Sequence, residues 1–154
     1  MNWHLKNWGR GDNLPENEEK KKYLNGYIFC KHKMERLSEQ INELRSQKMF
    51  PSVNNDGMPH GSGISDLSGY AGRLDELIRQ LEEERNTAIQ KYTEIHNQIQ
   101  SMEDGAEKEI LERRYLMGET WEMIAVHMHY TYRHVTRLHG TALYNFRLPE
   151  VHHG

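Results

Sequence analysis

The chain has 154 residues, of which 36% are hydrophobic and 28% charged, and its formal net charge is −3. This composition is too polar for a large globular core and too regularly patterned for disorder, so it favours one or two small units built from long amphipathic helices. The single cysteine, Cys30, excludes an internal disulfide and a zinc site with paired cysteines. No run approaches the roughly 20 apolar residues of a membrane span, so we expect none.

The first segment, residues 1–17, contains Gly9, Gly11, Asn13 and Pro15 and shows no apolar periodicity. It is predicted to be a flexible N-terminal arm. No apolar run follows its charged residues, so we expect no signal peptide and an intracellular protein.

Residues 18–104 carry two apolar series with the alternating three- and four-residue steps of a coiled-coil heptad. The first series consists of Tyr27, Cys30, Met34, Leu37, Ile41 and Leu44. The second consists of Leu74, Ile78, Leu81, Arg85, Ala88, Tyr92, Ile95, Ile99 and Met102, in which only Arg85 breaks the apolar run. Residues 51–68, rich in Gly, Pro, Ser and Asn, separate the two series and are predicted to be a loop. Two such helices joined by one loop predict an antiparallel coiled-coil hairpin.

Further apolar residues lie on the flanks of this predicted hairpin: Ile28, Phe29, Leu77 and Ile89. A lone hairpin would leave them in water, so we expect a homo-oligomer, most simply a dimer, formed through the coiled coil. The charged runs Lys20-Lys21-Lys22 and Glu82-Glu83-Glu84 are predicted to be solvated helix surface.

Residues 105–148 are predicted to form three short helices. The first spans residues 106–116 and ends at Gly118, a residue type that favours helix C-termini. Thr120 and Thr131 are suited to cap the second and third helices, and His129-Tyr130 forms the turn between them. The inner face of the second helix consists of Ile124, Ala125 and Met128. This pattern predicts a helix-turn-helix, followed by a short tail over residues 149–154.

One face of the third predicted helix is apolar and the other carries DNA-binding chemistry. Its buried stripe consists of Val135, Leu138, Ala142 and Phe146. The predicted DNA-binding residues are Thr131, Tyr132, Arg133, His134, Thr136, Arg137 and Gly140. Arginine can bond both acceptors of guanine, and threonine and tyrosine can bond phosphate or meet a thymine methyl group. Residues 131–147 hold three arginines and no carboxylate, a local charge of +3 to which His134 and His139 could add.

The segment TWEMIAVHMHYTYRHVTRLHGTALYNFR resembles the last region, region 4, of bacterial sigma-70-type factors. The matching positions are the caps Thr120 and Thr131, the pair Ile124-Ala125, Val135, and the pair Ala142-Leu143. The resemblance implies base contacts from Tyr132, Arg133, Thr136 and Arg137. His129 stands where many such motifs have a turn glycine, and Tyr132 where they often have arginine.

A wider resemblance covers about residues 23–146. YLNGY, SDLSGY, LERRYLMGETWEMIA and RLHGTAL, in this order, resemble small phage and prophage proteins of Gram-positive bacteria related to the RinA- and ArpU-type late-gene regulators. The resemblance implies an activator in the cytoplasm of a bacterial host that binds double-stranded DNA and acts with host RNA polymerase. The length leaves no room for a promoter-melting region, so we do not expect it to initiate transcription alone.

Two other functions stay open at this point. A small terminase-like packaging protein also joins a helix-turn-helix to a coiled coil, and would assemble into rings with weak sequence preference. An interaction module would use the same fold to dock on polymerase. We expect no enzyme and no cofactor, because the chain has no phosphate-binding loop on a strand, nucleophile elbow or convergent carboxylate pair. A metal site is disfavoured because the candidate ligands are badly spaced: His127, His129, His134, His139, His152 and His153.

Overall fold

The computed structural model describes residues 15–49 and 63–150, and within these ranges the chain forms helices and no strand, as predicted. The elements are α1 (Pro15–Leu24), α2 (Gly26–Met49), α3 (Gly63–Gln100), α4 (Ala106–Leu111), the π-helical turn η2 (Glu112–Leu116), α5 (Trp121–His127) and α6 (Tyr132–Asn145). No helix in the described ranges combines the length and apolarity needed to cross a membrane. The remaining parts of the predicted arm (residues 1–14), loop (residues 50–62) and tail (residues 151–154) lie outside the described residues.

Two helices begin earlier than the sequence pattern predicted. Helix α1 starts at Pro15, inside the predicted arm, because proline is well suited to the first helical position. Helix α3 starts at Gly63, inside the predicted loop. Ile64, Leu67 and Ala71 continue the three- and four-residue apolar steps backward from Leu74. The glycines and serines between them concealed this continuation.

The chain divides into two compact units, one formed by residues 30–87 and the other by residues 1–29 together with 88–154. The second of these joins α1 and the end of α3 to the C-terminal helices, whereas the sequence predicted a boundary between residues 104 and 105. The physical reason is a shared core: Leu24, Ile95 and Ile99 are fully buried in the same cluster as residues of α4, α5 and α6.

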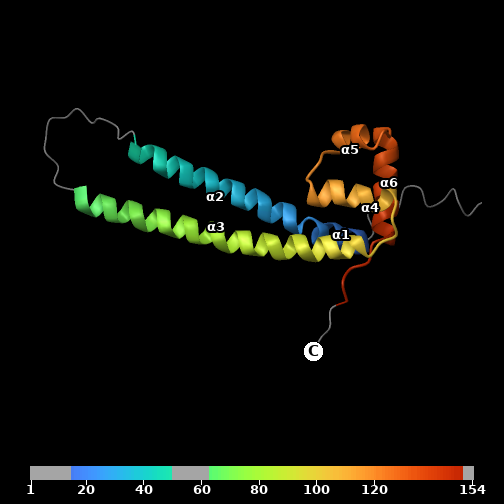
Figure 1. The fold of residues 1–154 in the computed structure, drawn as a ribbon, viewed down its shortest axis with the longest axis horizontal. Helices are drawn as coiled ribbons and strands as arrows, with labels where there is room; N and C mark the ends of the chain where they lie inside the picture. The colour runs from blue at the N-terminus through green and yellow to red at the C-terminus, as the bar shows by residue number, and fades with distance from the viewer. Residues whose placement is uncertain (1–14, 50–62, 151–154) are drawn as a thin grey trace, which may run out of the picture. The chain divides into compact units, whose positions relative to one another are not determined.

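In the unit of residues 30–87, α2 and α3 run side by side in opposite directions (Figure 1). The predicted seam residues Cys30, Leu37 and Ile41 are buried. On α3, however, the buried polar residue is Glu84, and Arg85 is exposed. The prediction that Arg85 lies in the seam, and that Glu84 is solvated surface, was therefore wrong. An ion pair with Lys33 compensates the buried carboxylate and lowers the pKa of Glu84 below its usual value.

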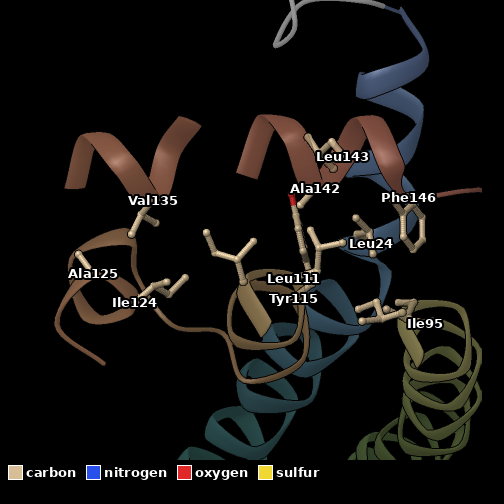
Figure 2. Packing of buried hydrophobic residues seen from close by; sticks show 12 residues of the cluster. Leu24, Ile95, Leu111, Tyr115, Ile124, Ala125, Val135, Ala142, Leu143 and Phe146 are labelled. Atoms are coloured by element: carbon tan, nitrogen blue, oxygen red, sulfur yellow. The ribbon is translucent and has the colours of Figure 1, made fainter. Parts of the chain in front are cut away.

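In the other unit, helix α6 is the central element and packs against α4, α5 and α1. The buried apolar side chains of this unit pack into one cluster (Figure 2). It consists of Leu24, Ile95, Ile99, Ile110, Leu111, Tyr115, Ile124, Ala125, Val135, Ala142, Leu143 and Phe146. The burial of one long side of α6 leaves residues on its other side exposed.

Lys20 fixes α1 to the C-terminal end of α6. Its side chain is buried, and its ammonium group donates a 3.0 Å hydrogen bond to the backbone oxygen of Leu143 while pairing with Glu16 at 2.8 Å. The carbonyls of the last helical turn have no partner within the helix, so a lysine there satisfies one of them. Lys20 had been predicted as solvated surface, and that prediction was wrong because its partner lies 123 residues away in the sequence.

We expect Lys20→Met to lower the free energy of unfolding by about 1–3 kcal/mol, since the Leu143 carbonyl loses its charged donor. The matched control is Lys22→Met on the same helix, where the side chain is exposed and a change within about 0.5 kcal/mol is expected. Urea unfolding followed by circular dichroism measures both. Equal stability of the two variants would show that the bond contributes nothing.

Glycine is required at position 118 and not at position 72. Gly118 has φ 73°, and a Cβ there would lie 3.2 Å from Cδ1 of Ile28, whereas a Cβ on Gly72 would meet no atom within 4 Å. Gly118→Ala should therefore destabilise the protein by about 1–2 kcal/mol. Gly72→Ala, in a helix interior, should stabilise it by about 0.5–1 kcal/mol. Thermal melts of the two variants check the opposite signs, and an unchanged melting temperature for Gly118→Ala would contradict the assignment.

Candidate nucleic-acid interface

Helices α5 and α6 both begin at threonine caps, as predicted. The hydroxyl of Thr120 accepts a hydrogen bond from the amide of Met123 at 3.3 Å, and the hydroxyl of Thr131 accepts one from the amide of His134 at 3.2 Å. Each cap satisfies an amide that has no carbonyl partner inside its helix. The two caps therefore fix where α5 and α6 begin, and with them the length of the turn between.

The turn itself is a Schellman-type helix end. The amide of Tyr130 donates to the carbonyl of Ala125 at 2.9 Å, and the amide of His129 donates to that of Val126 at 3.2 Å. His129 has φ 55°, a left-handed conformation that glycine adopts more easily. The predicted turn residues are therefore the observed ones, and His129 adopts a backbone conformation that favours glycine.

The inner side of α6 holds it against α5 and α4. Val135, Ala142 and Phe146 are fully buried, as predicted, and Val135 points toward Ile124 and Ala125 of α5 (Figure 2). Leu143 is also fully buried, although the predicted stripe omitted it. It directly follows Ala142, so the buried side of α6 is wider near its C-terminus than a single three-and-four spacing indicates.

The predicted DNA-binding residues divide into an exposed and a half-buried set. Thr131, Tyr132, Arg133 and Arg137 are exposed. His134, Thr136 and Gly140 are half-buried. The exposed set gathers at the first two turns of α6, where the helix also presents its amide groups. The half-buried set lies next in the sequence to the buried Val135 and His139.

Polar bonds organise this first half of α6. The guanidinium of Arg137 donates to Nδ1 of His134 at 2.7 Å, and the ring of Tyr130 stands edge-on to the His134 ring at 4.6 Å. The hydroxyl of Thr136 donates to the carbonyl of Arg133 at 3.1 Å. Thr136 is thus engaged with its own helix, while Arg137 is held by a neighbouring side chain.

The formal charge of α6 is entirely positive, because the helix contains arginine and no carboxylate. His139, which the sequence grouped with this basic face, is only 6% exposed and so lies outside the exposed face. Its Nε2 lies 2.9 Å from the hydroxyl of Tyr115, and its ring lies 4.7 Å from that of Trp121. The guanidinium of Arg114 lies over the Trp121 ring, 4.5 Å from its centroid. His139 therefore joins α6 to η2 and α5 and takes no part in the exposed face.

A separate ionic cluster lies around Glu119, before α5. Its carboxylate pairs with Arg113 at 3.2 Å and with His127 at 3.0 Å. Within residues 15–49 and 63–150, no three His, Cys, Asp or Glu side chains are grouped so that they could hold a metal ion. His152 and His153 lie outside the described residues. The Glu119 cluster links the segment before α5 to η2, and we interpret it as structural.

Tyr115→Phe tests the Tyr115–His139 bond. At neutral pH the variant should be about 1–2 kcal/mol less stable, since Nε2 of His139 loses its buried partner. Burial raises the pKa of Tyr115 to about 12, from 10.0. The folded state thus favours the neutral phenol. The contribution of Tyr115 to the free energy of unfolding is therefore complete below pH 10 and is lost as the pH rises toward 12. The free energy of unfolding of the wild type relative to Tyr115→Phe should fall by about 2–3 kcal/mol across that window in urea titrations, so that the variant becomes the more stable protein near pH 12. A pH-independent difference would contradict the shifted pKa.

No protein-family model, no curated protein and no solved structure matches the chain.

Proposed function

We propose that this chain is a sequence-specific DNA-binding protein that inserts α6 into the major groove of double-stranded DNA and regulates transcription. The observation that carries the proposal is the exposed side of α6: Arg133 and Arg137 project from a helix of 14 residues that contains no carboxylate. Such a surface attracts the phosphate backbone and carries the side chains that bond base edges.

The dimensions of α6 suit this role. Its 14 residues give a length of about 21 Å, and the major groove is about 12 Å wide, enough to admit one α-helix. The buried Val135, Ala142 and Phe146 hold the helix on its supporting core. A reading helix needs that support, because a misplaced side chain loses its hydrogen bonds to the base edge.

The residues near the start of α6 have separate roles in this proposal. Arg133 and Arg137 bond guanine or a flanking phosphate, and Tyr132, which is 51% exposed, contacts backbone or a thymine methyl group. The N-terminus of α6, capped by Thr131, directs its amides toward a phosphate. Gly140, half-buried one turn beyond Arg137, allows close approach.

The biological role follows the resemblance to phage late-gene regulators of Gram-positive bacteria. We infer an activator that works in the cytoplasm of the bacterial host with the host RNA polymerase. Exposed apolar side chains on α2 and α3, Phe29 at 66% and Ile89 at 56%, support self-association through these helices, which the heptad pattern predicts as a coiled coil. A dimer would place two reading helices on one duplex and so fix the spacing of half-sites.

A second candidate is a protein-docking module, favoured by one observation on α5. Met123 is 47% exposed and Val126 is 70% exposed, so the outer side of α5 presents apolar surface. A partner such as polymerase could bind there whether or not α6 reads DNA. A DNA-packaging protein would insert the same helix into DNA with little preference for sequence. The experiment below distinguishes the regulator, the docking module and the packaging protein.

The test starts with selection of bound duplexes from a random-sequence pool, followed by fluorescence anisotropy of the enriched duplex and a scrambled one over a salt series. The variant Arg133→Ala/Arg137→Ala should lose about 10–100-fold of the preference for the enriched duplex per guanine contact removed. The control Arg45→Ala/Arg85→Ala removes the same charge from exposed positions on α2 and α3 and should keep the preference.

The other outcomes identify the alternatives. Weak, equal binding to both duplexes that falls steeply with salt would indicate packaging or backbone contacts alone. No binding to either duplex would refute the DNA-binding proposal and favour docking through α5. Loss of preference in the control variant as well would show that α6 is not the reading surface.

A further inference from the structure

We propose that His134 is a positioning residue that sets the sequence preference of Arg137, and that Tyr130 holds His134 in place. This inference rests on the proposed function, since it names how the exposed side of α6 distinguishes one base pair from another. It follows from a chain of three contacting side chains, Tyr130, His134 and Arg137, which runs from the turn onto the reading helix.

The hydrogen bond between His134 and Arg137 determines the tautomer of the histidine. Arginine has only N–H donors, so Nδ1 of His134, at 2.7 Å from Nη2 of Arg137, must be the acceptor. In the neutral ring the proton then resides on Nε2. The histidine thus binds the guanidinium from one side and presents an N–H donor on the other.

Tyr130 gives the histidine a fixed support. Its ring is nearly perpendicular to that of His134, at 79°, with the centroids 4.6 Å apart. The backbone of Tyr130 is itself held by the 2.9 Å bond from its amide to the carbonyl of Ala125. The position of the tyrosine ring therefore depends on the turn geometry, which the left-handed His129 makes possible.

The consequence for recognition is a guanidinium that is oriented before DNA arrives. A free arginine side chain has about 2 kcal/mol of rotamer entropy to lose on binding. Its bond to His134 holds the guanidinium at Nη2, and an arginine uses two N–H donors for a two-fold bond to guanine O6 and N7. Holding the fork in one orientation favours the base whose acceptors match it, so His134 acts through Arg137 on specificity.

Arg133 provides an internal comparison. It is exposed on the same helix, and within the described part of the chain its side chain forms no hydrogen bond or ion pair. A flexible arginine can follow whichever acceptor is near, whereas a held one discriminates. We therefore assign the base preference to Arg137 more than to Arg133.

The experiment compares the sequence preferences that the wild type and four variants select from a random duplex pool. Arg137→Ala should lose the preference at one or two base pairs. His134→Phe keeps a ring against Tyr130 but removes the Nδ1 acceptor, and should lose the preference at the same base pairs by about tenfold. His134→Gln restores an acceptor and should recover most of it. His127→Phe, the same change on α5, should leave the preference unchanged.

A measurement without DNA tests the positioning directly. Nitrogen-15 spectra of the free protein at alkaline pH should show the Nε2–H tautomer for His134 in the wild type and a tautomer mixture in Arg137→Ala. An Nδ1–H tautomer in the wild type would overturn the inference even if His134→Phe failed to fold. If His134→Phe selects the wild-type sequence, the inference is wrong and the proposed function stands. If the wild type selects no sequence, the proposed function fails and this inference fails with it.

Discussion

The burial of one side of α6 is the constraint on which the rest of the C-terminal unit depends. Val135, Ala142, Leu143 and Phe146 are all fully buried, and they draw α1, α4 and α5 around the same helix. Because an α-helix repeats every 3.6 residues, fixing this side also fixes which residues face away from it. The exposure of Arg133 and Arg137 is thus a consequence of apolar packing on the opposite side, and the proposed reading surface needs no additional element to present it.

Hydrogen bonds at the two ends of α6 add to the apolar packing that holds the helix in place. At the start, the hydroxyl of Thr131 accepts from the amide of His134; near the end, the ammonium of Lys20 donates to the carbonyl of Leu143. Helix ends are where backbone groups lack internal partners, so these bonds hold α6 at a defined length and position. The middle is tied by His139 to Tyr115. A helix fixed in this way can carry side chains whose orientation matters to a fraction of an ångström.

Much of this arrangement could be predicted from local sequence. Both threonine caps, the turn at His129 and Tyr130 and the glycine at 118 follow from residue types with strong local preferences, and all four are observed.

Three buried polar residues could not be predicted. The sequence predicts Lys20 and Glu84 as solvated surface and His139 as a contributor to the basic face, because a charged or imidazole side chain usually lies in water. Each is buried by a partner from another element, Leu143, Lys33 and Tyr115 respectively. Helical periodicity cannot identify such partners. For the same reason the sequence pattern placed Arg85 in the seam of α3, whereas the buried residue is Glu84. The Tyr130–His134–Arg137 contacts also became visible only with the turn geometry in place.

The central claim is that α6 is the surface that meets DNA, and nuclear magnetic resonance mapping tests it most directly. A mixed-sequence duplex titrated into isotope-labelled protein at low salt would engage the basic surface even without a preferred site. We predict that the shifted backbone amides cluster in residues 130–141, with those around Met123 and Val126 on α5 unchanged. Shifts confined to α5 or to residues 30–87, or no shifts at all, would contradict the claim and show that the arginines of α6 serve some purpose other than DNA recognition.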